Sequence, residues 1–139
     1  MKRMLRYLVC AALLLTLGSC LPEGDFDERM LSDHQLPSLT VKGRTVFEYD
    51  PHSCQESWSP TTLTYRSGTD TMSDWFEIRL SNIPSELDRD IMANLSWTGR
   101  NSEESLSRLH FELRATDSDG HAWLWCRRQQ ILVVLRLID

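Results

Sequence analysis

The stretch that decides the fold is LHFELRATDSDGHAWLWC, residues 109–126. Apolar and polar residues alternate from Leu109 to Ala115, which is the two-residue period of a strand with one buried face. Asp117-Ser-Asp-Gly120 then supplies turn residues, because Asp and Gly both tolerate a left-handed backbone. Residues 122–126 return as an apolar run. The stretch therefore predicts an antiparallel β-hairpin.

The same reasoning extends to the flanking sequence. The run from Gln130 to Ile138 is apolar on both faces and predicts a strand in the middle of a sheet. Trp75–Ile83 alternates as cleanly as the hairpin does. Further strands are predicted over Leu39–Tyr49, where Gly43 marks a bulge or turn, and over Thr61–Arg66 and Asn94–Thr98. Short helical turns are possible only over Ser85–Met92 and over residues 101–106, which are acidic and rich in serine. Six to seven strands separated by turns predict an all-β protein, an antiparallel β-sandwich, with a small β-barrel as the alternative.

The N-terminus has the pattern of a secretory signal peptide over residues 1–19. Lys2, Arg3 and Arg6 precede a short apolar run, and the small residues Gly18 and Ser19 follow it. The run is shorter than the roughly 20 residues that a transmembrane helix needs. Residues 20–37 are acidic and lack apolar periodicity, which predicts a flexible tether. Residues 38–139 are then the β-sandwich domain.

Leu17-Gly18-Ser19-Cys20 resembles the bacterial lipobox. The resemblance implies that Cys20 is lipidated and becomes the first residue of the mature chain. The acidic residues that follow it resemble the export signal of surface lipoproteins of Bacteroidetes-type bacteria: Glu23, Asp25, Asp27 and Glu28. The chain thus looks like a small cell-envelope lipoprotein of that type, a family of unassigned function. The implied location is the bacterial outer membrane, either surface-exposed or facing the periplasm.

Charge narrows the classes of partner. Removal of residues 1–19 leaves 120 residues and changes the net charge from −5 to −8, because three cations and no acids leave with the signal. An acidic surface repels the phosphates of nucleic acid, so DNA and RNA are excluded as partners. Membrane contact is expected through the N-terminal lipid and not through a basic face.

Two cysteines remain once Cys10 leaves with the signal and Cys20 takes the lipid. A disulfide between Cys54 and Cys126 is permitted outside the cytoplasm. It would stabilise the fold by about 4 kcal/mol by closing a long loop. Two buried free thiols are the alternative.

No motif for catalysis, a metal or a cofactor is present. No serine lies in a Gly-x-Ser-x-Gly elbow, and no pair of ligands repeats at zinc spacing. Asp117-x-Asp119-Gly120 resembles the start of a calcium loop but lacks the later acidic ligands, and a hairpin turn explains the same residues. An enzyme would need a site built from loops, with His52 or His121 as its titrating group.

The candidate binding surface is formed by Trp123, Trp125 and Arg127. The two indoles are two residues apart, so they share one face of a strand. If exposed, they could stack on a sugar or pack on a protein partner, and the arginine could add cation–π contacts. If that face is the core, both rings are buried. The sequence leaves both readings open.

Together these features predict a lipid-anchored envelope protein that is not an enzyme and that binds a protein partner or a glycan. A structural subunit of an outer-membrane assembly is the alternative, followed by an enzyme with a loop-built site.

Overall fold

The computed structural model describes residues 25–68, 73–84, 87, 89–99 and 102–137. Within them the chain forms one short helix and nine antiparallel strands of a single sheet, which confirms the predicted all-β class. The elements are α1 (Arg29–Asp33), β1 (Ser38–Val41), β2 (Arg44–Glu48), β3 (Gln55–Ser59), β4 (Thr62–Arg66), β5 (Trp75–Leu80), β6 (Asp90–Gly99), β7 (Ser102–Thr116), β8 (His121–Cys126) and β9 (Ile131–Arg136). The order across the sheet is β2-β1-β9-β8-β7-β6-β5-β4-β3.

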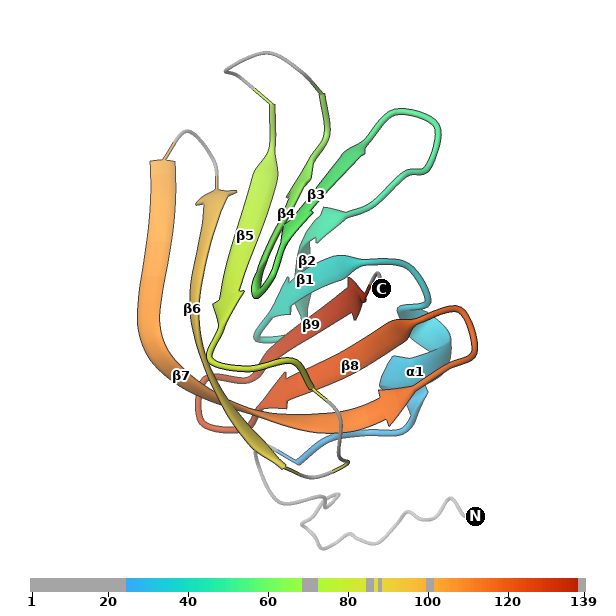
Figure 1. Ribbon diagram of the computed structural model, residues 1–139, viewed down its shortest axis with the longest axis vertical. Helices are drawn as coiled ribbons and strands as arrows, with labels where there is room; N and C mark the ends of the chain where they lie inside the picture. The colour runs from blue at the N-terminus through green and yellow to red at the C-terminus, as the bar shows by residue number, and fades with distance from the viewer. Residues whose placement is uncertain (1–24, 69–72, 85–86, 88, 100–101, 138–139) are drawn as a thin grey trace, which may run out of the picture.

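The sheet curls into a half-barrel, and its longest strand, β7, bends around the molecule (Figure 1). Two irregularities interrupt the pairing of β7. One lies opposite β6 at Arg108, which has a φ of +57° and whose backbone N–H donates to Asn94 Oδ1 at 2.9 Å. The other lies between Leu113 and Ala115, opposite β8. Bulges bend a strand and increase its twist, so they account for the curl.

The core lies inside the curl, between its two halves. Alternate residues of the strands point inward and are buried, as the alternation predicts. Phe47 on β2 and Phe76 on β5 meet edge to face, with ring centroids 5.3 Å apart. Tyr65 on β4 stacks on Phe76 at 5.0 Å. The half-barrel thus has the shared core of a sandwich inside one continuous sheet.

A polar clasp joins strands that are far apart in the sheet order. Arg136 Nη2 at the end of β9 donates to Glu56 Oε1 on β3 at 2.6 Å. The backbone N–H of Arg136 donates to the Tyr65 hydroxyl at 3.0 Å. The Glu56 side chain is only 7% exposed, so its charge is held in the curl by a partner 80 residues away in the sequence.

The structure has more strands than the six to seven predicted, for two local reasons. Lys42 and Gly43 both have positive φ and form a tight turn, so Leu39–Tyr49 contains two strands. The strand β3 is mostly polar, and only Trp58 gave it an apolar signal. Residues 102–106, for which the sequence allows a short helical turn, add no strand but extend β7 at its start, because pairing with β6 overrides their weak local preference.

The prediction of a flexible tether through residue 37 does not hold for its described part, residues 25–37. Residues 29–33 form α1, and Phe26, Met30 and Leu31 pack on the outer face of the sheet. All three side chains contact the same apolar cluster, so they lie on one side of the segment. No helix in the described ranges has the length and apolar character needed to cross a membrane.

The clasp generates the first testable prediction. Tyr65→Phe removes the acceptor of the Arg136 backbone N–H, so we expect the free energy of unfolding to fall by about 1 kcal/mol at neutral pH. Urea denaturation measures this change. Ser57→Ala, an exposed position on β3, serves as the control and should behave like the wild type.

The same variant has a defined pH signature. Burial raises the pKa of Tyr65 above its ordinary value of 10.0, although the hydrogen bond from Arg136 opposes the shift. Above pH 10 the Tyr65 hydroxyl therefore loses its proton in the unfolded chain but keeps it in the folded protein. The free energy of unfolding of the wild type then falls as the pH rises. The stability difference between the wild type and Tyr65→Phe should narrow from about pH 9 to about pH 11. A constant difference would contradict this account.

Candidate functional site

The structure shows that the predicted tryptophan surface is covered. Trp123 and Trp125 share the outer face of β8, and they are only 5% and 4% exposed. They form a second apolar cluster with Leu132 and Val134 of β9, separate from the core inside the curl. An exposed aromatic platform is therefore not present. This outer face is buried because a segment from the N-terminal side of the domain lies across it.

We call residues 25–36 the N-terminal strap. Its Phe26 ring meets Trp125 edge to face at 6.2 Å, and Met30 and Leu31 pack on the same cluster. The indole Nε1–H of Trp123 donates to the carbonyl oxygen of His34 at 2.8 Å. Each tryptophan thus contacts the strap, one through its ring and the other through its N–H.

The third residue of the predicted surface, Arg127, also holds the strap. Its guanidinium forms an ion pair with Asp25 and lies 3.7 Å from Glu112. Close by, the guanidinium of Arg114 lies over the Phe26 ring, 5.4 Å from its centroid. Trp123, Trp125 and Arg127 therefore all contact the chain's own N-terminal segment.

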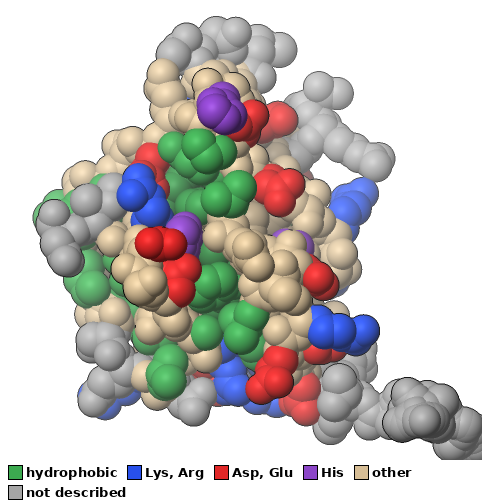
Figure 2. Space-filling view, turned by 90° about the vertical axis from the view of Figure 1, so that its right-hand side faces the viewer, with side chains coloured by type: hydrophobic (Ala, Val, Ile, Leu, Met, Phe, Trp, Pro, Cys, Tyr) green, Lys and Arg blue, Asp and Glu red, His purple; other side chains and the backbone are tan. Residues whose placement is uncertain are grey.

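A groove of about 640 Å³ borders the strap at the β7–β8 turn. Hydrophobic side chains run down this side of the molecule, with acidic, basic and histidine side chains around them (Figure 2). The groove is lined by Leu31, Gln35 and Leu36 of the strap and by Ala115, Thr116, Asp117, Asp119, His121 and Trp123 of the β7–β8 hairpin. One wall is therefore largely apolar and the other carries two carboxylates and an imidazole.

The Asp117 side chain organises the turn at the groove. Its Oδ1 accepts hydrogen bonds from the backbone N–H groups of Asp119 at 3.0 Å and His121 at 2.8 Å. Gly120 has a φ of +90°, and a Cβ there would lie 2.8 Å from the Leu137 carbonyl oxygen. Only glycine fits this position. The predicted hairpin turn between the two strands is thus present.

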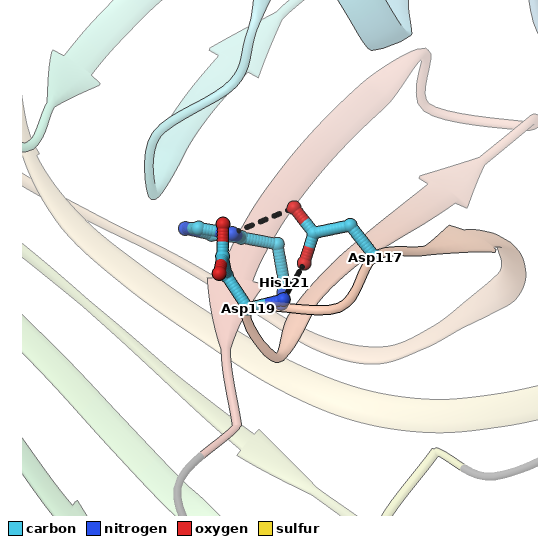
Figure 3. Close-up of side chains that lie close together, drawn as sticks. All are labelled: Asp117, Asp119 and His121. Carbon is cyan, nitrogen blue, oxygen red and sulfur yellow. Dashed lines mark hydrogen bonds and ion pairs between the residues drawn. The ribbon is translucent and has the colours of Figure 1, made fainter.

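The Asp117 carboxylate also orients His121. Its Oδ2 lies 2.9 Å from His121 Nδ1, and the side chains of the two residues face each other across the turn (Figure 3). Burial alone would raise the pKa of Asp117, but the hydrogen bonds from the His121 backbone and ring outweigh it and lower the pKa below its ordinary value. The His121 side chain is 11% exposed and its ring is tilted against Trp123. The carboxylate therefore holds a fixed imidazole at the groove.

Asp117, Asp119 and His121 also bring three ligand atoms within 4.8 Å of one another. Both Asp117 oxygens already accept hydrogen bonds within the turn, so a cation would have to compete with the backbone and with His121. The hairpin turn explains these residues without a metal.

The other candidate residues lie outside the groove. Cys54 and Cys126 are both free thiols, so the candidate disulfide is not formed. Cys54 Sγ lies 3.2 Å from the backbone N of Asp50, and Cys126 is buried in the core. His52 lies in the same turn as Cys54, where its backbone N–H donates to Asp50.

Sequence analysis did not find the strap wall of the groove, because Leu31, Gln35 and Leu36 belong to the segment that was expected to be a tether. The only signal for a packed strap was the presence of three large apolar residues, Phe26, Met30 and Leu31, in an otherwise polar segment. No protein-family model, curated protein or solved structure matches this chain.

The strap generates a prediction of its own. Phe26→Ala should uncover Trp125 and lower the free energy of unfolding by about 2 kcal/mol, because a half-buried ring is lost. Acrylamide quenching of tryptophan fluorescence should increase in the folded protein. Glu28→Ala, at an exposed strap position, is the control. Equal quenching of all three proteins would show that the strap does not shield the indole.

Proposed function

We propose that this chain is a lipid-anchored binding module of the bacterial cell envelope, without enzymatic activity, and that its ligand occupies the groove between the strap and the β7–β8 turn. The observation that carries the proposal is the composition of the groove. Leu36 is 39% exposed beside the carboxylates of Asp117 and Asp119. An exposed apolar side chain next to oriented polar groups is the usual make-up of a binding site.

The ligand that fits this groove best is a segment of a protein partner with a basic and an apolar side chain. The two carboxylates would attract the cation, and Leu31 and Leu36 would pack on the apolar side chain. A glycan is the second candidate, since carboxylates also bind sugar hydroxyls. Sugars, however, commonly stack on an aromatic face, and the faces of Trp123 and Trp125 are covered.

The lipid anchor is supported by the lipobox resemblance at Cys20 and by the strap. Only residues 21–24 separate Cys20 from Asp25, which is paired with Arg127. A chain anchored to the membrane at Cys20 would therefore reach the folded domain within a few residues.

The enzymatic alternative would use His121. A carboxylate-held imidazole is the arrangement of a general base. Among the described residues that line the groove, however, the only hydroxyl side chain is that of Thr116, and none is a serine or cysteine. The other alternative is a structural subunit of an outer-membrane assembly. In that case no ligand binds in the groove, and replacing Asp119 changes no binding.

A peptide array tests the binding proposal. The mature chain should bind peptides in which lysine or arginine neighbours an apolar residue. Asp119→Asn should weaken this binding by about tenfold, through the loss of one charged contact. Asp90→Asn is the control, because Asp90 is an exposed aspartate like Asp119 but lies outside the groove. Binding that ignores Asp119, or binding to glycans instead, would overturn the choice of partner.

The anchor has a separate test. Cys20→Ala should move the protein from the membrane fraction to the soluble fraction of cells, because no thiol remains to be acylated. Cys54→Ala, which removes a different thiol, should stay with the membrane. Retention of Cys20→Ala in the membrane fraction would show that the lipobox reading is wrong.

A further inference from the structure

The turns at the two ends of the β2-β1-β9-β8 half of the sheet carry opposite charges. At one end the β1–β2 turn contains Lys42 and the β8–β9 turn contains Arg127 and Arg128, with no acid in either turn. The backbone N–H of Lys42 donates to the Gln130 carbonyl at 2.8 Å, so these two turns lie side by side. We call this the basic end.

The opposite end carries the acidic turns. Asp50 lies in the β2–β3 turn, and Asp117 and Asp119 lie in the β7–β8 turn. These turns contain no Lys or Arg within 49–54 or 117–120. The six residues of β8 separate the two ends by about 20 Å. The domain is therefore polarised, although its total charge is negative.

The chain enters the domain at the basic end. Asp25 is paired with Arg127, and it lines one hollow together with Lys42 and Gln130. Residues 20–24 can span at most about 18 Å even when fully extended. A lipid on Cys20 would therefore keep this end within about two charge-screening lengths of the bilayer surface.

Neighbouring acids decide which of these cations are available. Arg127 is paired with Asp25 and lies near Glu112. Arg44, which follows the β1–β2 turn, lines a hollow together with Lys42 and Glu104. Lys42 and Arg128 are exposed and form no ion pair within the described residues. Arg44 is also exposed and forms no ion pair within the described residues, so these three side chains are the cations that can face a surface.

We infer that the basic end is a membrane-contact surface for anionic lipid headgroups, which turns the ligand groove away from the bilayer. This inference rests on the lipid anchor of the proposed function, and it adds a basic contact to a membrane attachment that the sequence assigned to the lipid alone. Each cation held near an anionic surface favours contact by about fivefold. The lipid supplies attachment and the basic end supplies orientation.

Lys42 allows a direct test, because it is the only lysine after residue 19. The lipidated protein is reconstituted in vesicles of phosphatidylcholine alone or with added phosphatidylglycerol, and Lys42 is labelled with an amine-reactive reagent. We expect labelling to be about fivefold slower on the anionic vesicles and to recover in high salt. Arg128→Gln should lose most of this protection. Arg79→Gln, an exposed position on β5, should keep it.

Flotation of the vesicles separates the two possible failures. If the protein does not float with the vesicles, the lipid anchor of the proposed function is wrong. If it floats but Lys42 is labelled equally on both kinds of vesicle, or if Arg79→Gln abolishes protection as Arg128→Gln does, the basic end is not a membrane-contact surface.

Discussion

The sheet can bury its inner face only by curling on itself, and the clasp of Arg136 with Glu56 and Tyr65 joins the strands that meet when it does. A buried carboxylate is costly unless a cation pairs with it. Glu56 is therefore stable only when β9 lies against β3 across the curl. The aromatic contacts between β2, β4 and β5 depend on the same closure.

The curl also explains why the molecule needs the N-terminal strap. The curl buries the inner face of β8 and β9, but the outer face of both strands is apolar as well. Two tryptophans, Leu132 and Val134 would face water without a cover. The strap provides that cover, and its edge against the β7–β8 turn forms the groove. The candidate site is thus made by two segments from opposite ends of the domain sequence.

Local pattern predicted much of this fold. The alternation over Leu109–Ala115, the Asp-Gly turn and the doubly apolar last strand are all found in the structure, and β9 lies within the sheet between β1 and β8. The errors have a common cause. The strand β3 and the start of β7 are polar, so their pairing depends on neighbours and not on their own periodicity. The strap was missed because its few apolar residues lie among acids.

The sequence by itself determined the strands that alternate or are apolar, and it determined the hairpin turn, since a two-residue period and turn chemistry are local properties. It also placed Trp123 and Trp125 on one face of a strand. Only the tertiary structure decided what lies on that surface. Whether an indole is exposed depends on a segment about 90 residues away, and packing over that separation leaves no local pattern. For the same reason, the polarity of the two ends appears only when the turns of distant strands are brought together.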